Sequence, residues 1–183
     1  MRPSVELVYD LVSGLEPFDD LEAEHRTDTL RWLRSTDDVF RRVKPATPDR
    51  HLVSYVVPVD PDSGNLLLVD HVNAGLWLPP GGHVEPDEHP ARTARREAYE
   101  ELGADAEVDE RLTFLTVTRT IGIDAGHTDV SLWFVVRLRQ DQPLTLDPGE
   151  FREARWWSPT DLRAADPTHF DPHLTRFLTK IGC

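Results

Sequence analysis

Apolar, β-branched runs separated by polar turn residues occupy the middle of the chain, and this pattern predicts β-strands. The turn signal from Pro61 to Asn65 favours a hairpin between the first two runs. The runs cover residues 52–60, 66–72, 112–121, 130–138 and 155–157. An acidic helix lies between the second and third runs, and a closing helix is expected at about 171–180. This order predicts an α/β layered domain.

The acidic helix is predicted from a helical period that begins at Pro90. Pro90 suits the first helical position, where its missing N–H is not needed, and Gly103 suits a left-handed residue after the last turn. Apolar residues recur at spacings of three and four, namely Ala91, Ala94, Ala98 and Leu102. Because this stripe is mostly alanine, we expect the helix to pack closely on the sheet.

Residues 1–48 differ from the rest, because they contain few strand formers and two candidate helices, at 5–13 and 19–35. The segment from Lys44 to Asp49 then breaks the pattern with two prolines. We expect an N-terminal helical extension (residues 1–48) packed on a main domain of residues 49–183. A role in capping the substrate or in forming a homodimer stays open for this extension.

Composition narrows the classes of function. The chain has 183 residues with 20 basic and 33 acidic side chains, a net charge of −13. Such a balance argues against binding duplex nucleic acid, which needs a basic face. No apolar run approaches membrane-spanning length, and we expect a cytoplasmic protein without membrane contact. The single cysteine, Cys183, excludes a disulfide framework.

The acidic helix brings three carboxylates together. A helix turns about 100° per residue, so Glu97, Glu100 and Glu101 share one face. Three hard oxygen donors within one turn suit Mg²⁺ or Mn²⁺. Just upstream, an apolar run ends in two prolines and the pair Gly81-Gly82, which predicts a strand followed by a loop whose backbone can approach a metal or a phosphate closely.

The spacing of these residues resembles the signature of the Nudix hydrolases, including MutT-like proteins. The match holds at the glycine and charged positions, with larger aliphatic residues more usual in the family where this chain has Ala98 and Ala104. The matching residues are Gly82, Glu88, Arg96, Glu97, Glu100, Glu101 and Gly103. This resemblance implies a Nudix-type α/β/α layered domain with a mixed β-sheet, to which this chain adds its helical extension.

The resemblance also implies a chemistry. Family members use divalent ions to hydrolyse the pyrophosphate bond of a nucleoside diphosphate linked to another moiety, such as a nucleoside triphosphate, a modified nucleotide or a nucleotide sugar. The expected catalytic residues are Glu88, Arg96, Glu97, Glu100 and Glu101. Of these, Glu97 and Glu101 are the expected principal metal ligands, Glu100 completes the set or binds the ion through a water molecule, and the Gly82 carbonyl is a further candidate. The Arg96 side chain is expected to orient a glutamate through a salt bridge to Glu88.

The general base is left open by the sequence. Family members take it from the signature glutamates or from a later loop, where Asp124, Asp129 and Glu150 are candidates. Glu150 leads because its loop directly precedes the strand at 155–157, although an acidic loop residue that is simply solvated is common.

Histidine and tryptophan side chains are weaker candidates. His127 and Asp129 lie two apart on one strand face and resemble a metal pair, but a hydrogen-bonded structural histidine is the more common meaning. His83 lies beside the glycine pair and is a candidate for phosphate contact. Trp156 and Trp157 must point to opposite faces of their strand, and Trp157 is a candidate for base stacking.

Two other functions stay open. A non-catalytic nucleotide-binding or regulatory module on the same fold predicts the loss of a signature glutamate, and none is lost. An isomerase of isoprenoid diphosphates resembles a chemistry that needs a cysteine inside the domain, whereas Cys183 is terminal. The tripeptide Arg119 to Ile121 stands where some subfamilies have a marker proline or tyrosine, so the substrate is not specified.

Overall fold

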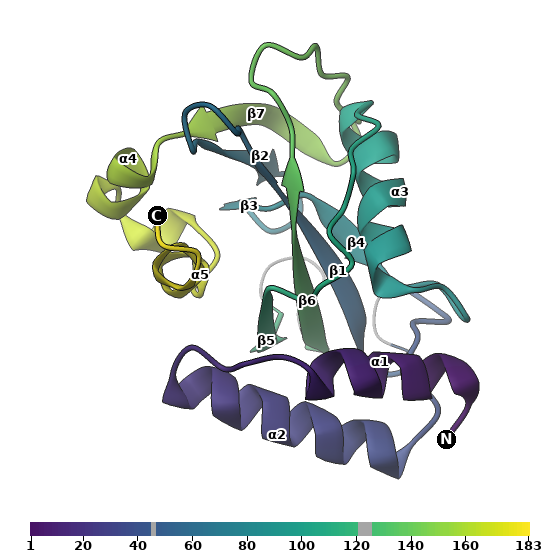
Figure 1. Cartoon of the computed structure of the whole chain (residues 1–183). Coiled ribbons are helices and arrows are strands. Elements are labelled where there is room, and N and C mark those ends of the chain that lie inside the picture. The colour runs from purple at the N-terminus through teal and green to yellow at the C-terminus, as the bar shows by residue number, and fades with distance from the viewer. Residues whose placement is uncertain (45–46, 121–125) are drawn as a thin grey trace.

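The computed structural model describes residues 1–44, 47–120 and 126–183. Within these residues one mixed sheet lies between helices (Figure 1). Its strands are β1 (Arg50–Val59), β2 (Leu66–His71), β3 (Leu76–Leu78), β4 (Gly81–His83), β5 (Phe114–Arg119), β6 (Thr128–Arg137) and β7 (Phe151–Trp157). The helices are α1 (Pro3–Ser13), α2 (Asp20–Ser35), α3 (Pro90–Leu102), α4 (Pro159–Ala164), the 3₁₀ turn η1 (Pro167–His169) and α5 (Leu174–Lys180).

The sheet has the strand order β3-β2-β1-β6-β5, with β4 paired to β1 and β7 paired to β2. Strands β1 and β6 run parallel, and the other pairs are antiparallel. A parallel pair needs a long crossover, which here contains α3. The expected mixed sheet is confirmed.

The central strand β1 shows why the domain has three layers. Val56 and Val57 are both fully buried, but they contribute to different hydrophobic clusters. Because successive residues of a strand point to opposite faces, each face of the sheet is covered. Val56 packs with residues of α1 and α3, whereas Val57 packs with Phe177 of α5. The expected α/β/α arrangement is therefore confirmed.

Helix α3 begins at Pro90 and ends at Leu102, and Gly103 follows with a φ of 66°. Its four stripe residues are all buried. The alanine side chains let the helix lie close to β1, β4 and β6, as predicted. The position of α3 against β4 is what places the signature glutamates.

Helices α1 and α2 cover the end of the sheet below β5 and β6 in Figure 1. Val5, Val8 and Leu33 are buried in the same hydrophobic cluster as Leu52 of β1. Glu22 of α2 is fully buried and accepts hydrogen bonds from the Leu115 N–H (3.1 Å) and from Lys180 Nζ (2.8 Å). The extension thus shares one core with the sheet.

Two sequence predictions need correction. The Gly81-Gly82 pair, expected in a loop, lies in β4, because both residues pair with β1. The strand expected at 155–157 begins at Phe151, since β7 pairs with β2 over most of that length.

No helix in the described ranges is long and apolar enough to cross a membrane.

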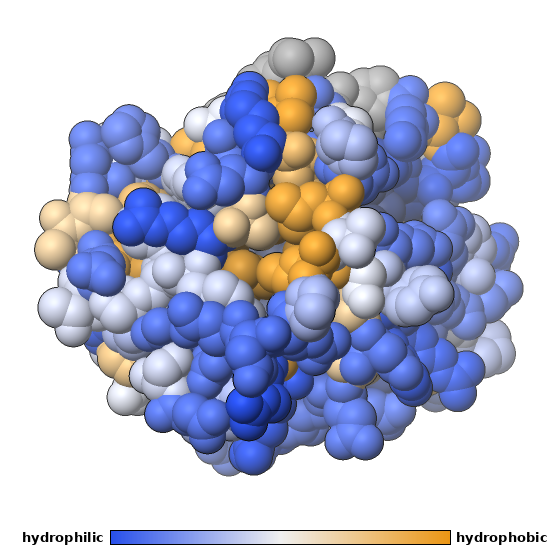
Figure 2. Space-filling model, turned by 90° about the horizontal axis from the view of Figure 1, so that it is seen from above, coloured by the Kyte–Doolittle hydropathy of each residue, from blue (hydrophilic) through white to orange (hydrophobic). Residues whose placement is uncertain are grey.

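Seen from above, the surface is mainly hydrophilic, with apolar residues gathered near the centre of that face (Figure 2). A hydrophilic surface agrees with the high content of charged residues, which is 29% of the chain.

Candidate functional site

The three helix glutamates have different environments. Glu97 and Glu101 are buried, with 9% and 5% of their surface exposed, whereas Glu100 is exposed. The inner pair lies one turn apart and faces β4. Glu100 lies on the solvent side of the same helix face.

Glycine at positions 81 and 82 allows the carboxylates to lie against the backbone of β4. Glu101 Oε2 accepts a hydrogen bond from the Gly81 N–H at 2.9 Å. A Cβ atom on Gly82 would overlap the Glu97 carboxylate, and one on Gly81 would overlap the Ser54 carbonyl. This close approach accounts for both glycines.

Arg96 joins the other charged residues of the signature. Its Nη2 and Nε atoms donate to the two oxygens of Glu88 at 3.0 and 3.2 Å, a two-pronged contact. Its Nη1 atom donates to Glu97 Oε1 at 2.7 Å and to Glu100 Oε2 at 3.1 Å. Thr93 Oγ1 also donates to Glu88, at 2.8 Å. The guanidinium is therefore held by Glu88 and in turn fixes one oxygen of Glu97.

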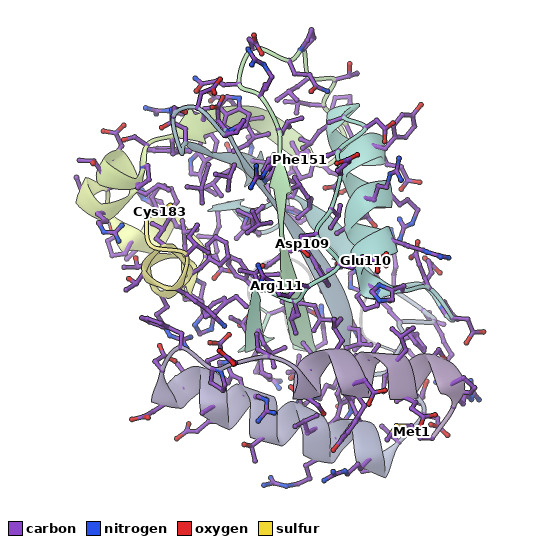
Figure 3. The ribbon with its side chains drawn as sticks, in the orientation of Figure 1. Met1, Asp109, Glu110, Arg111, Phe151 and Cys183 are labelled. Carbon is purple, nitrogen blue, oxygen red and sulfur yellow. The ribbon has the colours of Figure 1, made fainter. Side chains whose placement is uncertain are left out.

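Glu150 lies beside Glu101, although it comes from a distant part of the sequence. The Glu150 side chain lies close enough to Glu101 to raise the pKa of the Glu101 carboxyl. The adjacent residue Phe151, labelled in Figure 3, is buried in a cluster with Leu102 at the end of α3. The N–H of Asp147 in the same loop donates to the Glu101 carbonyl at 3.3 Å. These contacts bring the loop that precedes β7 against the C-terminal turn of α3.

Electrostatics mark Glu97, Glu101 and Glu150 as a carboxylate cluster. Burial and the neighbouring Glu97 and Glu150 raise the pKa of Glu101 to about 10. Burial also raises the pKa of Glu97, although Arg96 opposes this effect. Acids held this close together repel one another when ionised, and a cation between them removes that cost. The hard oxygen donors of the carboxylate cluster, held against a glycine cradle, suit Mg²⁺ or Mn²⁺.

A cavity of about 280 Å³ opens beside β4. Gly81 and Gly82 line it and also contact the helix glutamates, so the cavity and the carboxylate cluster adjoin. Its wall combines apolar and polar groups, among them Tyr55, Leu76, Leu78, His83, Asp129 and Ser131. A mainly apolar hollow with a few polar groups is typical of a small-molecule site.

His83 lines this cavity, and burial, together with the positive charge of Arg41, lowers the pKa of its imidazole to about 2. His127 and Asp129 also line it, and they lie with His83 and His51 in one group. His51 was not among the site residues predicted from the sequence. The signal that could have found it is strand register, because His51 pairs with Asp129 in the parallel ladder between β1 and β6.

The other candidates lie elsewhere. Trp157 packs edge-on against Trp77 and Phe170, with ring centroids 5.5 and 5.2 Å away, and it is not among the described residues that line the cavity. Trp156 belongs to a different hydrophobic cluster, as the opposite-face prediction requires. Asp124 lies outside the described residues.

Comparisons with known proteins agree with this geometry. A sequence model described as the NUDIX domain matches residues 49–178. An uncharacterized Nudix hydrolase of Rhodococcus erythropolis is 38% identical over 87 residues, which are 46% of this chain and 46% of that protein. This chain spans about half the length of the curated relatives it matches.

Solved structures show the same fold. The MutT protein of Methanosarcina mazei superposes with a TM-score of 0.60 and 21% identity over 72% of this chain and 95% of that one. The NUDIX domain of Shewanella oneidensis NrtR, solved with ADP ribose, has a TM-score of 0.56 and 16% identity, with 71% of this chain and 84% of that one covered. The matched domain, the fold and the signature helix together show that this chain belongs to the Nudix family.

Proposed function

We propose that the protein is a divalent-metal-dependent hydrolase that cleaves a pyrophosphate bond in a nucleoside diphosphate linked to another moiety. One observation carries the proposal: Glu97 and Glu101 are buried side by side against the Gly81-Gly82 backbone, beside a cavity of ligand size. A structural helix face has no reason to bury two carboxylates in this way, because burial without a cation costs free energy.

Glu97 and Glu101 would hold Mg²⁺ or Mn²⁺, with Glu100 and the Gly82 carbonyl completing the set. When bound, the ion supplies Lewis acidity that neutralises charge developing on the phosphate oxygens. Its positive charge also favours the ionised form of Glu101, opposing the effect of burial on that carboxyl. The arginine bridge from Glu88 to Glu97 would keep the Glu97 carboxylate in a fixed orientation.

Glu150 is our proposed general base. It is exposed and lies beside Glu101, so its carboxylate is open to solvent water at the edge of the carboxylate cluster. In the proposed step, a water oxygen forms a bond to phosphorus, the bridging P–O bond of the pyrophosphate breaks, and the water proton passes to Glu150. The two products are phosphate compounds.

The cavity beside β4 is proposed to bind the nucleotide part of the substrate. Tyr55, Leu76 and Leu78 give it apolar surface for a base or sugar, and His83 lies at the side nearest the glycines. The Shewanella protein of the same fold was solved with ADP ribose, which supports a nucleoside diphosphate as the common element. Nucleoside triphosphates, modified nucleotides and nucleotide sugars all contain it.

The test is hydrolysis of a panel of these compounds with Mg²⁺, with Mn²⁺ and with neither, with phosphate products measured. Glu97→Gln and Glu101→Gln should each lower kcat by about two orders of magnitude or more, because metal charge stabilisation is worth several kcal/mol. The matched control is Glu110→Gln, at an exposed position in the connection between α3 and β5 (Figure 3), which should leave kcat unchanged. Tight binding of a nucleotide without hydrolysis of any panel member would instead support a regulatory binding module.

We also propose that residues 1–48 form a helical extension to a catalytic domain of residues 49–183. The support is the buried Glu22, whose carboxylate links α2 to β5 and α5.

A further inference from the structure

Four side chains gather at one end of the sheet, and none of them belongs to the carboxylate cluster. They are His51, His83, His127 and Asp129, here called the histidine cluster, and their ligand atoms all lie within 4.8 Å of one another. His51 comes from β1, His83 from the end of β4, and Asp129 from β6, with His127 just before β6. Three strands therefore converge on one point.

The outer ring nitrogens of His51 and His127 each have a hydrogen-bond partner. His51 Nδ1 lies 2.8 Å from the Pro48 carbonyl oxygen, which has no hydrogen to give, so Nδ1 carries the proton. His127 Nδ1 lies 3.2 Å from Thr120 Oγ1, a hydroxyl oxygen that also lies 3.2 Å from the His127 carbonyl oxygen. The Nε2 atoms of both rings point inward, toward Asp129.

Both Nε2 atoms face the same acceptor. Asp129 Oδ1 lies 3.2 Å from His51 Nε2 and 3.3 Å from His127 Nε2. The oxygen is buried, and within the described part of the chain it receives no hydrogen bond. His83 Nε2 lies a further 3.1 Å from His51 Nε2. A divalent cation among these atoms would satisfy all four at once, because imidazole nitrogens and carboxylate oxygens are its usual ligands.

The spacing suits a tetrahedral ion. A metal bound at about 2.0 Å by four N or O ligands has ligands about 3.3 Å apart. The three short distances in the histidine cluster, from 3.1 to 3.3 Å, agree with that separation. Three imidazoles and one carboxylate are a donor set typical of Zn²⁺ rather than of Mg²⁺. Backbone and hydroxyl groups hold the outer nitrogens, as they commonly do for metal-binding histidines.

We propose that the histidine cluster is a second metal site, which binds Zn²⁺ and is separate from the Mg²⁺ or Mn²⁺ site on α3. The ion would tie β1, β4 and β6 together. Because His83 directly follows Gly82, it would also fix the strand against which Glu97 and Glu101 lie. The proposal rests on the ligand geometry and stands whether or not the protein hydrolyses pyrophosphates.

The test uses the full chain after treatment with a chelator. Titration with Co²⁺ should give one equivalent of ion with the strong visible absorption of four-coordinate cobalt, and Zn²⁺ should displace it. His51→Asn and Asp129→Asn should each weaken the affinity for both ions by more than about 100-fold, because even partners of metal ligands are worth 10-fold to 100-fold. The matched control, His169→Asn, changes an exposed histidine in η1 and should have no effect.

Two further measurements keep the result interpretable. Circular dichroism reports whether each variant folds, and Asp129→Asn preserves the shape of the side chain in case His51→Asn does not fold. The double variant Glu97→Gln/Glu101→Gln should keep the cobalt spectrum. The proposal is overturned by the absence of a stoichiometric site, by unchanged affinity in folded His51→Asn and Asp129→Asn, or by loss of the spectrum in the glutamate double variant.

Discussion

Arg96 Nη1 donates a hydrogen bond to Glu97 Oε1 at 2.7 Å, while Nε and Nη2 of the same guanidinium donate to the Glu88 carboxylate. The planar fork of arginine makes both contacts at once, which the single ammonium of lysine cannot do. Arg96 thus links its sequence neighbour Glu97 to Glu88, which lies in the loop before α3. The relationship makes Glu88 a positioning partner for a carboxylate that it does not touch.

Arg96→Lys is therefore expected to keep the charge and lose activity. We predict a fall in kcat of about 10-fold to 100-fold, the usual cost of removing a partner that orients a metal ligand. Steady-state hydrolysis at saturating Mg²⁺ measures it. Arg95→Lys, at an exposed position on the same helix, should change kcat little, and equal losses in the two variants would contradict the assigned role of Arg96.

Gly82→Ala is expected to disturb the carboxylate cluster directly. Its new methyl group would overlap the Glu97 carboxylate, so that side chain must move away from β4. We predict loss of at least about 90% of kcat, since small misplacements of catalytic groups have effects of this size or larger. Gly14→Ala is the control, because a Cβ atom there makes only ordinary contacts. Unchanged hydrolysis by a folded Gly82→Ala protein would argue against metal binding at this strand.

Lys180→Met tests how the N-terminal extension is held. Lys180 Nζ lies 2.8 Å from a fully buried Glu22 carboxylate. Removing the ammonium leaves that charge without its cation, and we expect a loss of about 3–5 kcal/mol in unfolding free energy. Urea denaturation measures it. Lys44→Met, at an exposed lysine, should lower the unfolding free energy by less than about 0.5 kcal/mol. A loss as large as that of Lys180→Met would contradict the assigned role of the Lys180–Glu22 pair.

Asp19 predicts a specific dependence of stability on pH. Hydrogen bonds from Arg176 at 2.8 Å and from the Glu22 N–H lower the pKa of Asp19 from its ordinary 3.8 to about 2. A lowered pKa means that the ionised form stabilises the fold. This contribution is present above about pH 4 and is lost as the pH falls toward 2.

Asp19→Asn keeps an N-cap acceptor and removes the charge. Because the Asp19–Arg176 pair is partly exposed, we expect the unfolding free energy of the Asp19→Asn variant to be about 1 kcal/mol lower than that of the unchanged protein at pH 7. This difference should shrink below pH 3. Urea denaturation at both pH values measures this gap, and Asp20→Asn, at an exposed neighbour, is the control. A gap of constant size across this range would contradict the assignment.

The sequence predicted α3 almost to the residue, because its signals are local. Pro90, Gly103 and the alanine stripe each act within one or two turns of the helix, and so does the clustering of its glutamates. The extension helices were likewise predicted within two residues, since both have their own apolar periodicity.

Features that depend on pairing between distant segments were not predicted. The glycine pair was expected in a loop, because nothing local shows that β1 would accept it as a strand neighbour. His51 was not noticed, because only the register of β1 with β6 brings it to Asp129. Glu150 was ranked by its place in a loop, whereas its contact with Glu101 depends on the docking of β7 beside β2.

The parallel pairing of β1 with β6 also bears on the order of folding. Arg50 pairs with Thr128 and Val59 pairs with Arg137, so β3, β4, α3 and β5 all lie within the chain segment that this pairing closes. Long-range pairings form slowly, because the loop must close before any contact compensates for the lost entropy. During synthesis, β1 cannot complete this pairing until residue 137 has been added to the chain. Helix α3, which carries the signature glutamates, is therefore synthesised well before the β1–β6 ladder against which it packs can be completed.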